Sequence, residues 1–371
     1  MERLMIYPFD IESMPLIRHK KLLSKYDITA LVSPNGWGMT NKDASMVDNA
    51  SELNMDISNS FEKEIITVDT VLFLESSIKL DFKKLLYPKF LIAIEQSKNI
   101  ICSIKLDEKI KNELMQKCIE KQIRFEYIIA NENDNISLKD EEKLLYEINT
   151  PVVFVCGNDE RTDKFEIQLL LREYLQDDGY TISQIGTKNY SNILDFHIFP
   201  QFMYENYLSE TEKIIRFNHY VKYIELNENP DLIVIGVPFG IMPFDNEFNN
   251  NFGIMLYEVS NALKPDYAIF SNTYREYSKE DLENIYNLVK YKFSFDIDCF
   301  NISNTRIDWN KSKQLAGKAY TKIPYTFIDN DIVQFNDNNV PVINILNKSN
   351  GSFLYEHLIN SLSDNEKLTW I

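Results

Sequence analysis

The stretch Pro151–Leu171 reads PVVFVCGNDERTDKFEIQLLL, and it decides how the larger part of the chain should fold. An apolar run typical of a buried strand leads into a loop that starts at Gly157, and a helical pattern begins beside Lys164. These are the parts of a phosphate-binding P-loop, in which helix N–H groups and a lysine ammonium hold phosphate oxygens. We therefore predict a P-loop-like domain.

The loop departs from the usual pattern in three ways. It is one residue longer than G-x-x-x-x-G-K, Asp163 takes the place of the second glycine, and Phe165 replaces the Ser or Thr that would bind magnesium. Asp159, Glu160 and Asp163 would also oppose a triphosphate unless Arg161 or a metal ion offsets their charge. The loop therefore predicts phosphate binding with altered chemistry.

Two interpretations of these residues stay open. In the first, ATP or GTP binds the loop, with Mg²⁺ as a possible companion of the nucleotide and no metal site formed by the protein itself. The residues expected to bind it are Gly157, Arg161, Thr162, Asp163 and Lys164. Replacing Lys164 with Ala would then weaken nucleotide binding roughly tenfold or more and change fold stability little. In the second, the segment is an ordinary strand-to-helix turn capped by Thr162 or Asp163.

Alternating strand and helix patterns extend over the whole chain, which predicts an α/β protein with parallel sheets. We expect two domains, a Rossmann-like one over residues 1–135 and a P-loop NTPase-like one over residues 150–371, because residues 131–150 are polar and charged. The strands expected in the first domain are Leu4–Tyr7, Ile28–Val32, Thr70–Leu74, Ile100–Ile104 and Phe125–Ile129. Those expected in the second are Val152–Cys156, Tyr180–Ile185, Asp231–Gly236, Tyr267–Phe270 and Phe295–Phe300.

The run Pro230–Gly240 predicts a second strand beside the P-loop strand, closing in a turn at Gly240. It lacks the terminal acid that would hold a metal-bound water, and the nearest acids are Asp245 and Glu247. We therefore expect no efficient nucleotide hydrolysis.

Other candidates are two histidines and a loop in the first domain. His197 and His219 each fit a structural role better than that of a catalytic base. Asn35, Gly36 and Trp37 follow a predicted strand and could face a ligand, although a tight turn covered by Trp37 explains them as well.

Composition narrows the functional classes. The 371 residues carry a net charge of −17, which disfavours nucleic acid as a partner. No apolar run is long enough for a bilayer and no export signal opens the sequence, so we expect no membrane association and a cytoplasmic location. The separated cysteines predict buried thiols; they are Cys102, Cys118, Cys156 and Cys299.

The chain resembles the clostridial peptide maturation system proteins, encoded beside Cys-rich ribosomal peptides and their radical SAM maturases. The segments that carry the resemblance are Tyr7–Asp10, Arg18–Lys20, Ser33–Gly38, Lys164–Leu169, Ser183–Gly186 and Phe217–Tyr220. The second domain is also similar to two-domain NTPase-like proteins.

The resemblance implies a part in making a modified peptide natural product (a RiPP). One hypothesis is an accessory nucleotide-binding protein, with weak NTPase activity at most. The alternative is a non-catalytic scaffold with a degenerate P-loop fold that binds the precursor peptide or the radical SAM maturase.

Overall fold

The computed structural model describes residues 1–129, 144–241, 251–315 and 317–368. Its Cα positions form two compact units, of which unit 1 comprises residues 1–129 with 189–195, and unit 2 the rest of the described chain. Most of the predicted boundary interval, together with Asp245 and Glu247, lies outside the described residues.

Unit 1 contains a six-stranded sheet in the order β3-β2-β1-β4-β5-β6, with every pairing parallel. This order is that of a Rossmann sheet. The strands are β1 (Glu2–Tyr7), β2 (Tyr26–Val32), β3 (Ile57–Ser58), β4 (Thr70–Phe73), β5 (Asn99–Cys102) and β6 (Phe125–Tyr127). The α-helices are α1 (Met14–Arg18), α2 (Phe61–Glu64), α3 (Tyr87–Glu95) and α4 (Glu108–Glu120).

Unit 2 contains a seven-stranded parallel sheet in the order β15-β12-β11-β7-β10-β8-β9. The strands are β7 (Val152–Gly157), β8 (Ile182–Gly186), β9 (His197–Ile198), β10 (Leu232–Gly236), β11 (Tyr267–Asn272), β12 (Cys299–Ile302) and β15 (Val342–Ile343). The P-loop strand β7 is central, and β10 pairs with it as predicted.

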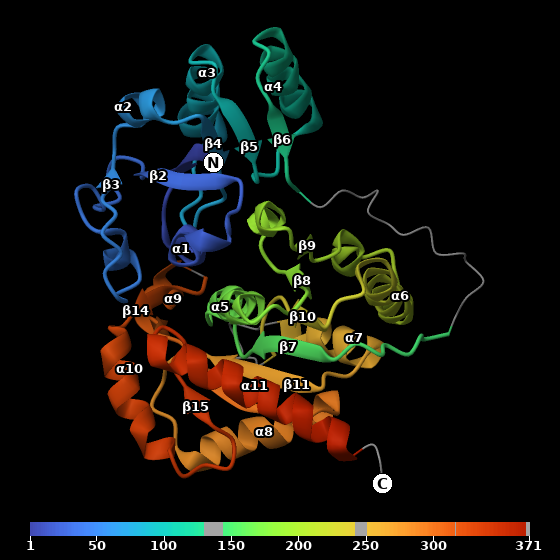
Figure 1. Ribbon diagram of the computed structural model, residues 1–371. Helices are drawn as coiled ribbons and strands as arrows, with labels where there is room; N and C mark the ends of the chain where they lie inside the picture. The colour runs from blue at the N-terminus through green and yellow to red at the C-terminus, as the bar shows by residue number, and fades with distance from the viewer. Residues whose placement is uncertain (130–143, 242–250, 316, 369–371) are drawn as a thin grey trace. The chain divides into compact units, whose positions relative to one another are not determined.

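Helices cover both faces of the unit 2 sheet (Figure 1). They are α5 (Lys164–Asp177), α6 (Glu210–Glu228), α7 (Ile254–Ala262), α8 (Lys279–Phe293), α9 (Trp309–Leu315), α10 (Tyr325–Ile332) and α11 (Lys348–Leu368). On one face, α11 reaches β11 through a hydrogen bond of 2.7 Å between Tyr267 Oη and His357 Nδ1. The other face packs against α6, α7 and α8.

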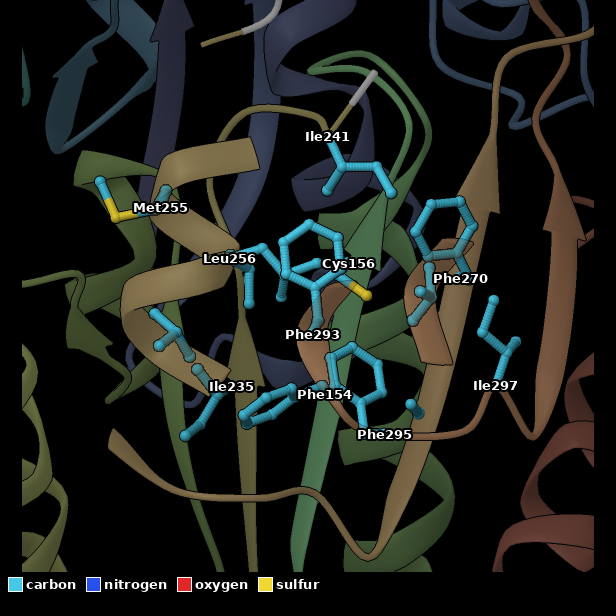
Figure 2. Close-up of a cluster of buried hydrophobic side chains, with 14 of the residues drawn as sticks. Phe154, Cys156, Ile235, Ile241, Met255, Leu256, Phe270, Phe293, Phe295 and Ile297 are labelled. Carbon is cyan, nitrogen blue, oxygen red and sulfur yellow. The ribbon is translucent and has the colours of Figure 1, made fainter. Parts of the chain in front are cut away.

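The core on that second face is aliphatic and aromatic. Figure 2 shows Cys156 of β7 beside Phe293 of α8 and Leu256 of α7, and Phe154 of β7 beside Phe295. Burial of such side chains contributes about 1.5–3 kcal/mol each, which fixes the position of β7 and therefore the start of the loop that follows it. All four cysteines are buried and free, as predicted.

The α/β fold class is confirmed, and the differences are local. The sequence analysis missed the two-residue strands β3 and β9, and β12 begins at Cys299 rather than Phe295. It also missed an antiparallel hairpin formed by β13 (Thr305–Ile307) and β14 (Tyr320–Lys322). Strands this short give no readable alternation of apolar and polar residues.

Candidate functional site

The loop after β7 starts at a position where the chain requires glycine. A Cβ on Gly157 would collide with the backbone carbonyl oxygen of Ser271 and with the side chain of Thr162. Ser271 belongs to β11, the neighbouring strand, so neither strand can yield without losing sheet pairing. The glycine therefore allows the close strand packing from which the loop begins.

Asp163 occupies the N-cap position of α5 with φ 60° and ψ 19°. This left-handed conformation is the one that a glycine adopts most readily, and Asp is among the few other residues that tolerate it. The side chain of Asp163 makes no capping hydrogen bond. Side-chain capping by Asp163, one form of the alternative interpretation, is therefore wrong, and Thr162 Oγ1 donates to Asp159 O at 3.2 Å instead of accepting from the helix. An ordinary strand-to-helix turn stays the alternative to a phosphate site.

Lys164 lies under the loop, with 4% of its surface exposed. Its ammonium donates hydrogen bonds to Asp159 O at 2.5 Å and to Phe239 O at 2.6 Å. Burial lowers the pKa of Lys164 to about 8, against the opposing attraction of Asp159. The ammonium thus sits where solvent no longer stabilises its charge.

This burial corrects one expectation. We expected a Lys164→Ala change to affect fold stability little, but it would leave two inward-facing carbonyl groups without their donor. Unpaired buried acceptors cost roughly 1–3 kcal/mol each. Lys164 therefore holds the loop to the turn after β10 as well as being a candidate ligand contact.

The loop's acidic side chains are paired with cations from the β13–β14 hairpin. The carboxylate of Asp159, 0% exposed, accepts from Lys318 Nζ at 2.7 Å and from Tyr320 Oη at 3.0 Å. Asp163 Oδ1 lies 3.3 Å from Lys322 Nζ. The repulsion that the sequence analysis expected between these acids and a phosphate is therefore largely offset by residues more than 150 positions away.

Arg161 also contacts the hairpin. Its guanidinium lies 5.0 Å from the ring centroid of Tyr320, in a cation–π arrangement. The hairpin therefore holds the loop through an aromatic ring as well as through charge. The hairpin could not be predicted, because two three-residue strands carry too little pattern of apolar and polar residues.

Buried polar side chains connect the carboxyl ends of β7, β11 and β12. Asn158 accepts from the backbone N–H of Thr273 at 2.9 Å, and Ser271 Oγ donates to the Thr162 carbonyl. Asn301 Nδ2 in turn donates to Ser271 Oγ at 2.7 Å. The sequence signal for this network was the polar ends of two buried strands, which the sequence analysis did not use.

A cavity of about 770 Å³ opens beside this network. Asn158 belongs to its lining, so the cavity adjoins the loop. Most of the wall comes from the segment after β11 and from the hairpin with its neighbouring helices; among the lining residues are Tyr274, Arg275, Tyr277, Arg306, Trp309 and Phe327.

The position that usually supplies a magnesium ligand after the P-loop lysine carries a side chain without oxygen. Phe165 is buried with its ring packed edge-on against Phe196 at 5.9 Å between centroids, so it supplies no oxygen. Within the part of the chain that the structure describes, no group of three or more His, Cys, Asp or Glu side chains could hold a metal ion.

The remaining candidates of unit 2 lie at different distances from the loop along the sheet. Gly240 is buried next to Phe239, whose carbonyl accepts from Lys164. His197 is on the edge strand β9, separated from β7 by β8 and β10, with its Nε2 2.6 Å from Glu228 Oε1. His219 is on α6, and its Nε2 lies 2.8 Å from the carbonyl oxygen of Leu144, which precedes β7. Both histidines make structural contacts.

In unit 1, Asn35 and Trp37 line a cavity of about 320 Å³ at the carboxyl ends of β1 and β2. Gly36 between them has φ 90°, a conformation that favours glycine. Lys84 and Lys89 also line this cavity. Whether these residues bind a ligand stays a prediction.

No protein-family model matches the chain, and no curated protein matches it. Among solved structures, a DUF1611 family protein from Anabaena variabilis is similar over 97% of this chain and 100% of its own, with a TM-score of 0.63 and 10% identity. This likeness shows a shared fold over both units. None of these solved structures is described as a clostridial peptide maturation protein.

Two further likenesses are weaker. A putative oxidoreductase from Bacteroides fragilis covers 50% of this chain and 55% of its own at 14% identity and a TM-score of 0.27. A GTPase from Pyrococcus abyssi covers 56% and 83% at 14% identity and a TM-score of 0.28. TM-scores this low support no conclusion about the fold or function of this chain.

None of the described helices is long and apolar enough to cross a bilayer.

Proposed function

We propose that unit 2 binds the phosphate groups of ATP or GTP at the loop from Gly157 to Lys164, as an accessory protein rather than a fast NTPase. The observation that carries the proposal is Lys164: a buried ammonium at the start of a 14-residue helix, beside a residue in the conformation of a P-loop glycine. A phosphate would restore the stabilisation that burial removes from this charge.

Charge around the loop supports the proposal. Lys318 and Lys322 compensate Asp159 and Asp163, while Glu160 is exposed to solvent. The dipole of α5 adds a positive field at its N-terminus. With Asp159 and Asp163 paired, the loop presents Arg161 and Lys164 against the single carboxylate of Glu160.

Slow or absent hydrolysis is part of the proposal. The strand β10 ends at Gly236 and continues into Val237 without an acid, and Phe165 supplies no magnesium ligand. Since the residues present do not fit a protein-bound Mg²⁺, we expect nucleotide binding to depend little on magnesium. Rapid phosphoryl transfer usually needs both features.

The biological setting remains the one implied by the resemblance, namely maturation of a Cys-rich ribosomal peptide with a radical SAM maturase. The scaffold alternative has one observation in its favour. Lys164 already has two carbonyl acceptors, so the fold uses this lysine whether or not a nucleotide binds. In that case the precursor peptide or the maturase would bind elsewhere on the surface.

Calorimetric titration with ATP and GTP, with magnesium or with a chelator, separates the two hypotheses. The test variant is Lys164→Met, which keeps much of the side-chain volume, and its folding is checked by circular dichroism. The control is Lys264→Met. Lys264 also donates to a backbone carbonyl, Phe293 O at 3.1 Å, but it precedes β11 and so lies at the amino ends of the parallel strands, whereas the loop follows the carboxyl end of β7.

We expect wild type and Lys264→Met to bind alike and Lys164→Met to bind roughly tenfold more weakly or worse, the loss of a charge-assisted contact. Absence of binding by folded wild type would leave the scaffold hypothesis. Equal binding by folded Lys164→Met would also contradict the nucleotide site.

A further inference from the structure

The 770 Å³ cavity has the size and lining of a binding site for a second ligand. Small-molecule sites are concave, mostly apolar, and carry a few polar groups that fix orientation. Here the apolar part includes Trp309 and Phe327, which are 40% and 53% exposed. Aromatic side chains this exposed around a cavity favour a ligand with an apolar or aromatic body.

The charged lining favours an anion. Arg275 and Arg306 line the cavity together with one acid, Glu276. Arg275 is already engaged, since its guanidinium lies 3.0 Å from Asp281 and over the ring of Tyr277. Arg306 is exposed and makes no side-chain hydrogen bond or ion pair with any of the described residues.

The hairpin register explains why Arg306 is available. In the β13–β14 pair, Thr305 is opposite Lys322 and Ile307 is opposite Tyr320, and this face carries the residues that hold the loop. Arg306 is opposite Thr321 on the other face. Alternation along the strand therefore gives one side of the hairpin to the loop and leaves the guanidinium on the other.

We propose that this cavity binds a small amphipathic carboxylate, such as an amino-acid derivative or the C-terminal residue of a peptide. The apolar body contacts Trp309 and Phe327, and the carboxylate pairs with the guanidinium of Arg306. Arginine suits this role because its planar fork matches a carboxylate in two parallel hydrogen bonds. The site does not require the proposed nucleotide function, since Lys164 is not part of its lining.

The test uses the full-length protein and calorimetric titration with N-acetylphenylalanine and with its neutral carboxamide. Arg306→Gln removes the charge at an exposed position, and Phe327→Ala removes an exposed ring. Lys313→Gln is the matched control, because Lys313 is an exposed cation of the neighbouring α9 that does not line the cavity.

We expect wild type and Lys313→Gln to bind the acid alike and to bind the carboxamide at least about tenfold more weakly. Arg306→Gln should bind acid and carboxamide equally, and Phe327→Ala should lose affinity for both. No binding of the acid at millimolar concentration, equal binding of acid and carboxamide by wild type, or an unchanged affinity in Arg306→Gln would each overturn the proposal. Nucleotide titration of Arg306→Gln should match wild type, so failure here is distinct from failure of the nucleotide site.

Discussion

The turn after β1 in unit 1 and the loop after β7 in unit 2 occupy corresponding places, since each follows the first strand of a parallel sheet. Both contain a buried acid, Asp10 at 2% exposure and Asp159 at 0%. The carboxylate of Asp10 accepts hydrogen bonds from Ser77 and from the backbone of Glu12. Asp159 is paired with Lys318 and Tyr320 instead.

The two turns differ in how the charge of the buried acid is compensated. Neutral hydrogen bonds satisfy Asp10 but leave its charge uncompensated, and α1 that follows has only five residues. The loop of unit 2 has its charge offset by lysines and leads into a 14-residue helix. Equivalent positions in two parallel sheets thus differ in charge compensation through side chains supplied from elsewhere in the chain.

The largest expected effect separates the two glycine positions of these regions. Gly157→Ala should lower the free energy of unfolding by about 3 kcal/mol or more, because its Cβ meets the backbone of Ser271. Gly36→Ala meets no atom within 4 Å and pays only for its φ of 90°, roughly 1–2 kcal/mol. Chemical denaturation measures both. Equal losses of stability in the two variants would mean that the backbone of Ser271 does not restrict the residue at position 157.

The pH dependence should differ in sign between Lys164 and Asp10. Burial lowers the pKa of Lys164 in the folded protein to about 8, against an ordinary value of 10.5, so the unfolded chain binds more protons between these values. Relative to Lys164→Met, wild type should gain about 3 kcal/mol of stability as pH rises from 8 to 10.5. Denaturation curves at several pH values test this. A constant difference would show that the ammonium is well solvated.

Asp10 provides the opposite case. Burial raises the pKa of Asp10 above its ordinary value of 3.8, so the folded protein holds this proton more tightly than the unfolded chain. Its contribution to stability is fully present below pH 3.8 and is lost as pH rises through the folded pKa. Wild type should therefore lose stability relative to Asp10→Asn over that interval, and a gain would contradict the comparison.

A smaller effect concerns Asp163. Asp163→Gly relieves the left-handed strain by about 1 kcal/mol and removes the pair with Lys322, so stability should change little. Nucleotide affinity should rise about tenfold, because an acid leaves the phosphate site and Lys322 is released. Lys322→Met should lower the affinity by a similar factor. Calorimetric titration of both variants checks this, and changes in the same direction would contradict it.

A structural feature of this protein could be predicted from the sequence when it corresponds to a long pattern of apolar and polar residues. The strand Val152–Gly157 and the helix behind Lys164 carry long apolar patterns, so the fold class and the place of the loop could be predicted. The partners of Asp159 and Asp163 could not, because both lysines are distant in sequence: Lys322 is on the three-residue strand β14, and Lys318 lies just before it. Burial of Lys164 was missed since a lysine beside a loop ordinarily reaches solvent.

The smallest expected effect concerns His197, the candidate farthest from the loop along the sheet. Its ring pairs with Glu228 at 2.6 Å, and both side chains are partly exposed, at 30% and 42%. Such surface pairs contribute about 0–1 kcal/mol, so His197→Gln should lower stability by no more than that. Two strands, β8 and β10, separate β9 from β7, so the substitution should not alter the loop that follows β7. Nucleotide affinity of His197→Gln should therefore equal that of wild type. A loss in calorimetric titration as large as that of Lys164→Met would place a ligand contact at the β9 edge and move the candidate site away from the carboxyl end of β7.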